Sequence, residues 1–257
     1  MTKQLRTRIA SASVMIGFFV LWEIICVAFH VREIVVPRPS VILATLWEDL
    51  PGIWPHDLQT IYTTLVGFGI GIVAGVLLGI LVGSSKLAYD VAYPLLIGFA
   101  SIPKVAVVPI LVLWCGAGTI PAIITAAITC VFPVIVNVAT GLATTEPELE
   151  DVMRTLRASK LDILRNVGLP RAMPYFFASL KVAVTLAFVG TVISETVASN
   201  RGIGNLMMIA SSRFDVPLVF AGLLILAVMG VMLYGVFSLI ELRVTGWTRR
   251  QDMSVSG

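Results

Sequence analysis

The charged side chains that could do chemistry in this chain are concentrated in one stretch, residues 144–174. Five of them are basic and five are acidic: Arg154, Arg157, Lys160, Arg165, Arg171, Glu146, Glu148, Glu150, Asp151 and Asp162. Cysteines and histidines stand at unrelated spacings, so they predict neither a metal site nor a disulfide framework. No glycine-rich phosphate loop and no pair of nucleophile and base can be recognised. We therefore expect no enzymatic activity, no cofactor and no bound metal.

A second group of ionisable residues lies inside apolar stretches, where a charge is costly. Lys104 stands between Pro103 and Pro109, and a lysine at the centre of a membrane helix costs about 2.5–3.5 kcal/mol. It either attracts an anion along a transport pathway, or it reaches the interface or pairs with a carboxylate. We assign Pro103, Lys104, Pro109 and Glu195 to a candidate translocation pathway and expect Glu23 to be structural.

Capping signals predict that a helix–turn–helix positions the charges of residues 144–174. Thr145 with Glu148 forms a capping box that begins a first helix. Apolar residues recur along it at helical spacing: Leu149, Val152, Met153 and Leu156. Ser159 with Asp162 predicts the start of a second helix, which we expect to end at Gly168–Pro170.

The rest of the chain is apolar enough to cross a membrane repeatedly. Hydrophobic residues make up 58% of its 257 residues, and charged residues make up only 13%, against about 25% in soluble domains. A membrane helix needs about 20 apolar residues. Six stretches qualify, the third of them interrupted by prolines: about 11–29, 59–83, 91–115, 119–142, 175–198 and 217–240. The sequence therefore predicts an all-α, polytopic membrane protein with a single domain over residues 1–257.

Glycine recurs at every fourth position of the second stretch, at Gly67, Gly71, Gly75, Gly79 and Gly83. Residues four apart share one face of a helix, so this glycine ladder forms a groove that lets another helix approach closely. The partner is either a helix of the same chain or a sliding or dimer surface.

Basic residues indicate the orientation in the membrane. They gather before the first stretch, in residues 144–174 and after the last stretch, whereas the alternate loops carry few of them. Because cytoplasmic loops are enriched in Lys and Arg, we expect both termini and residues 144–174 in the cytoplasm. The net charge of +3 gives no sign of a nucleic-acid surface.

Residues 144–174 resemble the cytoplasmic coupling loop of ABC-importer membrane subunits, whose pattern is Glu-Ala-Ala, three residues, Gly, nine residues and Ile-x-Leu-Pro. Asp151-Val152-Met153 stands at the Glu-Ala-Ala, and Val167-Gly168-Leu169-Pro170 stands at the last motif. Arg157 replaces the Gly, which permits a close approach or a special backbone angle that arginine does not offer cheaply. The resemblance implies a helix that docks on an ATP-hydrolysing subunit through these residues: Glu148, Glu150, Asp151, Arg154, Thr155, Arg157, Ala158, Leu169 and Pro170.

Two further segments resemble the nitrate, sulfonate and taurine branch of these permeases. They are Val36-Pro37-Arg38-Pro39-Ser40, followed by a short amphipathic helix to about Leu50, and the proline-containing run from Ile102 to Gly116. The resemblance implies a homodimer in the bacterial inner membrane. Its expected partners are two copies of a cytoplasmic ATP-binding subunit and an external or periplasmic substrate-binding protein.

The same resemblance suggests a small anion as the solute, such as a sulfonate, taurine, nitrate or bicarbonate. A vitamin precursor or an aromatic acid is the alternative substrate. The alternative function is a stand-alone secondary transporter or channel that uses Glu23, Lys104 and Glu195 as an ion relay. The absence of a clear inverted repeat speaks against that alternative.

Overall fold

The computed structural model describes residues 3–143, 152–153 and 155–244. Every regular element within these residues is a helix, which confirms the predicted all-α fold class. Four residues that we expect in the coupling helix lie outside the described residues: Glu148, Glu150, Asp151 and Arg154.

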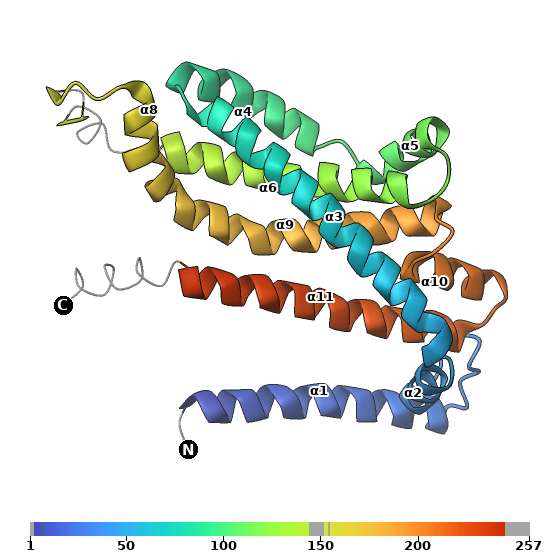
Figure 1. Ribbon diagram of the computed structural model, residues 1–257. Coiled ribbons are helices and arrows are strands. Elements are labelled where there is room, and N and C mark those ends of the chain that lie inside the picture. Colours follow the sequence, from blue (N-terminus) through green and yellow to red (C-terminus); the bar gives the residue numbers. More distant parts are fainter. Residues whose placement is uncertain (1–2, 144–151, 154, 245–257) are drawn as a thin grey trace.

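Five long helices dominate the molecule (Figure 1): α1 (Lys3–Ala28), α3 (Leu50–Gly83), α6 (Thr119–Ala143), α9 (Leu169–Ala198) and α11 (Val216–Val244). The shorter helices are α2 (Pro39–Glu48), α4 (Lys86–Ala100), α5 (Val108–Cys115), α8 (Lys160–Ile163) and α10 (Ile203–Ser212). A 3₁₀ turn, η1 (Lys104–Val107), precedes α5, and a π turn, η2 (Leu164–Gly168), precedes α9. The start of α1, the end of α11 and α8 lie at one end of the molecule, and α2 and α10 lie at the other.

The number of membrane crossings agrees with the prediction of about six. Among the described residues, five helices are long and apolar enough to span a membrane, and a sixth crossing results if α4 and η1–α5 are one broken span. The two halves of that pair are bent by 76° at the break. Pro103 stands there in an extended conformation and has no N–H to donate, whereas Pro109 falls in the first turn of α5 and is tolerated.

The second span begins earlier than the sequence suggests. Its helix, α3, starts at Leu50 rather than near residue 59, with Pro51 in its first turn. Its early turns carry polar side chains that find partners elsewhere in the chain. His56 lies against Gly202, and Gln59 donates to the hydroxyl of Thr119 at 3.1 Å. These interactions allow a polar segment to be helical where a hydropathy pattern predicts a loop.

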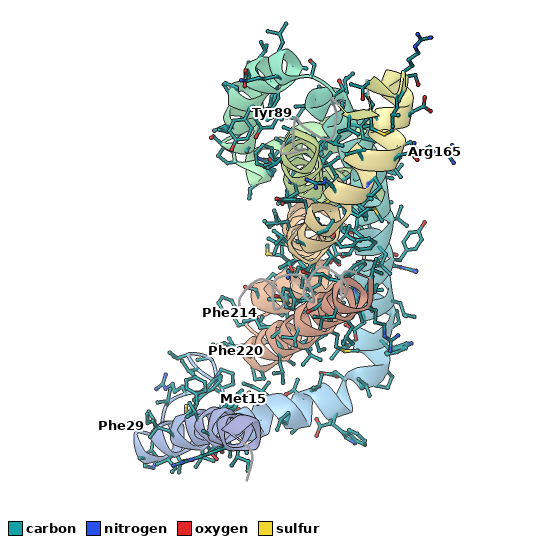
Figure 2. The ribbon with its side chains drawn as sticks, turned by 90° about the vertical axis from the view of Figure 1, so that its left-hand side faces the viewer. Met15, Phe29, Tyr89, Arg165, Phe214 and Phe220 are labelled. Carbon is teal, nitrogen blue, oxygen red and sulfur yellow. The ribbon has the colours of Figure 1, made fainter. Side chains whose placement is uncertain are left out.

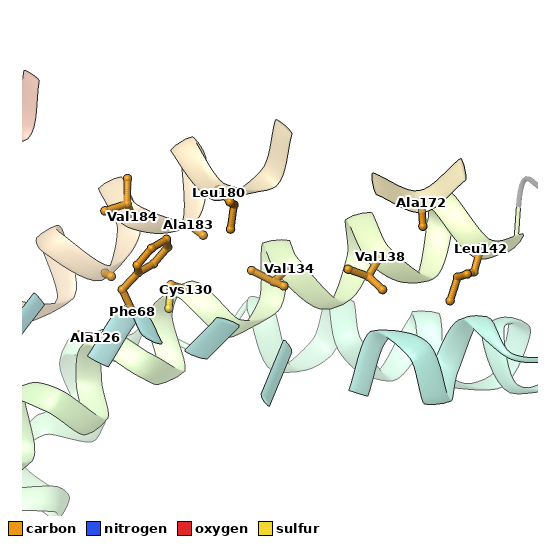
Figure 3. Packing of buried hydrophobic residues seen from close by; sticks show 11 residues of the cluster. Phe68, Ala126, Cys130, Val134, Val138, Leu142, Ala172, Leu180, Ala183 and Val184 are labelled. Carbon is orange, nitrogen blue, oxygen red and sulfur yellow. The ribbon is translucent and has the colours of Figure 1, made fainter. Parts of the chain in front are cut away.

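The core lies where α3 and α9 pack against α6 (Figure 3). Its buried members are Phe68, Ala126, Cys130, Val134, Val138, Leu142, Ala172, Leu180, Ala183, Val184 and Ala187. The glycine ladder of α3 faces α6 of the same chain. A Cβ on Gly75 would lie 2.7 Å from the Cβ of Val134, and a Cβ on Gly79 would lie 2.7 Å from the Cβ of Val138. Only glycine permits the two backbones to approach this closely.

The helices stack in a row when viewed along their length, with Met15 of α1 and Tyr89 of α4 toward opposite ends of the row (Figure 2). At one end, Glu23 of α1 accepts hydrogen bonds from the backbone N–H and the hydroxyl of Ser40, at 3.0 and 2.7 Å. Between α9 and α11, Lys181 forms an ion pair of 2.7 Å with Glu241. Polar side chains therefore link the outer helices to their neighbours.

Candidate functional site

The first candidate site is the elbow, which we define as the described part of residues 152–170. Its first helix ends at a left-handed residue, Arg157, whose φ is +58°. The N–H of Leu156 donates to the carbonyl of Val152 at 3.2 Å, and the N–H of Ala158 donates to the carbonyl of Met153 at 3.0 Å. This is a Schellman-type helix end, in which the left-handed position is usually glycine.

The unusual backbone angle explains why a glycine would suit position 157. A left-handed conformation costs an L-amino acid roughly 1–2 kcal/mol, and glycine avoids that cost. The glycine of the family pattern is expected to serve either a close approach or a special backbone angle. The structure shows the special backbone angle at this position, and Arg157 adopts it. Its side chain is exposed, and among the described residues it has no hydrogen bond or ion pair.

The second corner of the elbow is the predicted capping box at Ser159, which is confirmed. The hydroxyl and the N–H of Ser159 donate to the carboxylate of Asp162 at 2.6 and 3.0 Å, and the N–H of Asp162 donates to the Ser159 hydroxyl at 3.2 Å. These donors, the hydroxyl first, hold the pKa of Asp162 below its ordinary value. The cap therefore fixes where the chain turns toward α8.

The predicted end of the second helix at Gly168–Pro170 is wrong. The backbone continues from α8 through the π turn η2 into α9, and Gly168 has a helical φ of −63°. A Cβ on Gly168 would lie 3.1 Å from the Leu142 side chain, so this glycine serves a close approach to α6. Pro170 falls in the first turn of α9, where its ring is tolerated. The elbow is therefore continuous with a membrane helix.

The elbow carries an exposed apolar face. Val152 is 55% exposed and Leu156 is 73% exposed, and residues four apart lie on the same side of a helix. The other described coupling residues differ in exposure: Thr155, Arg157 and Pro170 are exposed, and Ala158 and Leu169 are half-buried. The described part of the predicted coupling set therefore falls in two places, the helix end at residues 155–158 and the first turn of α9 at Leu169 and Pro170.

The second candidate site is the clasp, which we define as Glu195, Thr60 and His56 with the backbone of residues 202–204. Glu195 is 1% exposed, and its Oε2 accepts from the Thr60 hydroxyl at 2.9 Å and from the Gly204 N–H at 3.2 Å. The Ile203 N–H donates to the Thr60 hydroxyl at 2.9 Å, and the Gly202 N–H donates to Nδ1 of His56 at 3.1 Å. Side chains of α3 and α9 thus satisfy N–H groups at the start of α10 that a helix leaves unpaired.

Two glycines make room for the buried carboxylate of the clasp. Gly202 has a φ of +116°, and a Cβ there would overlap the carboxyl group of Glu195. A Cβ on Gly204 would lie 2.6 Å from the carbonyl oxygen of Val192. Sequence reasoning singled out Glu195 but missed Thr60 and His56. The available signal was the Gly-Ile-Gly segment that follows an isolated carboxylate.

The other candidate pathway residues lie at the break in the third span. The Lys104 ammonium group donates to the carbonyls of Phe99, at 3.1 Å, and Ala100, the last residues of α4. Lys104 is half-buried, whereas Pro103 and Pro109 are exposed. Within the described residues no carboxylate pairs with Lys104. The lysine therefore satisfies carbonyls that the break leaves without helical partners.

Comparison with known proteins identifies the fold and the family. The chain of a solved structure of the MetNI methionine ABC transporter, in an inward-facing conformation, superimposes with a TM-score of 0.65 at 18% identity, covering 78% of this chain and 98% of that one. A probable ABC transporter permease of Haemophilus influenzae is 30% identical over 90% of this chain and 94% of its own length.

Two further relatives carry substrate names. The formylaminopyrimidine transport permease ThiX of Halalkalibacterium halodurans is 28% identical over 90% of this chain and 93% of its own length. The putative aliphatic sulfonates transport permease SsuC of Bacillus subtilis is 30% identical over 88% and 83%. The profile of the binding-protein-dependent transport system inner membrane component matches residues 71–246, which include the elbow and, of the clasp, Glu195 and residues 202–204. The chain therefore belongs to this family and is the permease subunit of an ABC importer.

Proposed function

We propose that the elbow is the coupling segment through which a cytoplasmic ATP-binding subunit drives this permease. The observation that carries the proposal is the exposed apolar pair Val152 and Leu156 on a corner that is continuous with a membrane helix. Apolar side chains this exposed on a polar loop favour contact with another protein. The contact set comprises Thr155, Arg157, Ala158, Leu169 and Pro170, together with the expected residues outside the described part: Glu148, Glu150, Asp151 and Arg154.

The proposed transmission follows from the continuity of the backbone. Helical structure runs from Lys160 through η2 to Ala198, so a displacement of the elbow moves α9 along its whole length. At the far end of α9, Glu195 holds the start of α10. ATP binding in the partner subunit would thus displace residues at both ends of the bundle, because packed helices move as discrete units.

The proposed assembly contains two copies of this permease, two ATP-binding subunits and an external substrate-binding protein. The second copy is proposed from the family resemblance, and the exposed apolar side chains of α4 and α5 are available for contact with it or with lipid: Leu95, Phe99, Leu113 and Trp114. The start of α1 and the end of α11 lie at the same end as α8, which supports cytoplasmic termini in the inner membrane. We place the broken span, with Pro103, Lys104 and Pro109, along the solute pathway together with Glu195.

The proposed solute is a small anion of the sulfonate, taurine, nitrate or bicarbonate type. The similarity to a sulfonate permease supports this class. A vitamin precursor is the second candidate, because a formylaminopyrimidine permease is similar over nearly the whole chain. Ligand screening of the cognate binding protein separates the two classes. Unchanged uptake in Lys104→Met would remove the lysine from the argument for an anion.

Binding of the purified ATP-binding subunit tests the coupling proposal. Leu156→Asp places a charge on the apolar face of the elbow, so the variant should fail to retain the ATP-binding subunit during purification. Phe214→Asp is the matched control, because Phe214 is equally exposed but lies in the α10–α11 turn at the other end. Charge reversal at Asp151 or Arg154 should uncouple ATP hydrolysis from uptake. Normal partner binding by Leu156→Asp would contradict the proposed docking face.

A further inference from the structure

The left-handed conformation of Arg157 lacks a local reason. Glycine would adopt the same φ of +58° without strain, and the exposed guanidinium group bonds to none of the described residues. The local contacts do not explain why an arginine stands at this strained position. A strained residue without a local reason points to a role of its side chain in binding something else.

A capping role for the guanidinium group is already taken by other donors. Basic residues near the end of a helix often bind its last carbonyl groups. Here the carbonyl of Val152 accepts from the Leu156 N–H and from the Thr155 hydroxyl, at 3.2 and 2.6 Å. The carbonyl of Met153 accepts from the Ala158 N–H at 3.0 Å. These two carbonyls therefore have donors other than the arginine side chain.

The position of Arg157 suits it to recognition of another protein. It follows Leu156 directly, at the edge of the exposed apolar face that includes Val152. Arginine is one of the residue types enriched among the side chains that contribute most to binding at protein interfaces. A guanidinium group presents parallel N–H donors that match the two oxygens of a carboxylate.

We propose that Arg157 is a specificity-determining residue for the ATP-binding subunit. Its guanidinium group binds a carboxylate at the edge of an apolar groove that receives Leu156 and Val152. This inference rests on the proposed coupling function of the elbow. It adds that the groove of the correct partner carries a carboxylate at the position that faces Arg157, next to the left-handed end of the coupling helix.

The substitution Arg157→Gly separates the side chain from the backbone. Glycine relieves the left-handed strain, so the thermal stability of the purified permease in detergent should stay the same or rise. Affinity for the purified ATP-binding subunit of the same transporter should nevertheless fall by about tenfold or more, because a charge-assisted bidentate pair is lost. Arg157→Lys should retain part of the affinity, since lysine keeps the charge but not the planar fork.

Salt dependence and two controls complete the test. Affinity of the wild-type permease should weaken as NaCl is raised, and Arg157→Gly should show a shallower dependence. Arg213→Ala removes an exposed arginine from the α10–α11 turn, at the other end of the molecule, and should bind like the wild type. Equal affinity of Arg157→Gly and wild type at low salt would overturn the inference. Because Leu156→Asp tests the docking face itself, loss of binding there with normal binding by Arg157→Gly would refute only the role of the arginine.

Discussion

At the scale of single residues, the two candidate sites depend on backbone conformations that few residue types adopt. Gly202 in the clasp and Arg157 in the elbow both have positive φ angles. At Gly202 the conformation brings the backbone over the carboxyl group of Glu195, and a side chain would occupy the same space. At Arg157 the surrounding space is open to solvent. A positive φ therefore occurs in both sites with opposite consequences. At Gly202 there is no space for a side chain, whereas at Arg157 the side chain extends into solvent.

Gly202→Ala should destabilise the permease markedly. The Cβ would overlap the Glu195 carboxyl group, and the backbone of Gly202, with φ +116° and ψ +161°, lies in a region that is essentially restricted to glycine and would add about 1–3 kcal/mol. Thermal unfolding in detergent measures the effect. Gly98→Ala is the control, because a Cβ on Gly98 meets nothing within 4 Å and alanine favours the helix. Equal stability of the two variants would contradict the described packing of the clasp.

Protection of the elbow against hydrogen exchange should depend on pH through Asp162. The pKa of its carboxyl group is lowered by the Ser159 hydroxyl and N–H, so the stabilisation is complete above the ordinary value of 3.8 and is lost as pH falls through the lowered pKa. Asp162→Asn should remove most of this protection above pH 3.8, where the wild-type carboxylate is ionised. Hydrogen exchange measured by mass spectrometry, corrected for intrinsic rates, detects the difference. A wild-type pH profile identical to that of Asp162→Asn would speak against the cap.

At the scale of helices, the glycine ladder sets the distance between α3 and α6. Its five glycines place the two backbones in contact, and the Val134 and Val138 side chains fill the remaining space. Because interior packing leaves few voids, a single added methyl group must displace a neighbour. The pair is consequently suited to move as one unit rather than to slide.

Gly75→Ala should destabilise the permease by about 1–3 kcal/mol through overpacking. A Cβ there would lie 2.7 Å from the Val134 Cβ and 3.1 Å from the Val131 carbonyl oxygen. Gly69→Ala is the matched control on the same helix, because a Cβ on Gly69 meets nothing within 4 Å. That control should be neutral or stabilising by up to about 1 kcal/mol. Thermal unfolding that ranks the two variants in the opposite order would exclude the described helix contact.

Helices and corners with local signals could be predicted from the sequence, whereas ties between distant segments could not. The capping box at Ser159 and the break at Pro103 depend on neighbouring residues, and both are found in the structure. Gly168 carries the usual signal for a helix end, yet contact with Leu142 of α6 makes it part of a continuous helix. The hydrogen-bond partners of Glu195 come from α3 and α10, and no pattern in the residues next to Glu195 predicts them.

At the scale of the whole molecule, the bundle is elongated and its two candidate sites lie at opposite ends. The elbow lies at the end where α1 begins and α11 ends, while α2, α10 and the clasp lie at the other (Figure 1). The tight contacts of α3, α6 and α9 occupy the middle. This arrangement separates a surface suited to a cytoplasmic partner from a surface suited to an external one.

Cysteine labelling in cells tests this orientation. After replacement of the exposed native Cys115 by serine, a membrane-impermeant maleimide should label Phe214→Cys in intact cells. Leu156→Cys should react only after the membrane is permeabilised, because the elbow is expected in the cytoplasm. The remaining native cysteines, Cys26 and Cys130, are buried and should contribute little background. The reverse labelling pattern would contradict the proposed orientation and would place the elbow outside the cell.

The clasp also constrains the order of events during synthesis. His56 and Gly202 are 146 positions apart, so the polar start of α3 has no partner from α10 until most of the chain has left the ribosome. The ladder contact between α3 and α6 involves residues much closer in sequence and can form earlier. A nascent chain stalled before residue 202 would therefore hold a packed helix pair whose polar end is unfinished. Quality-control factors that recognise exposed polar groups in a bilayer would meet that state.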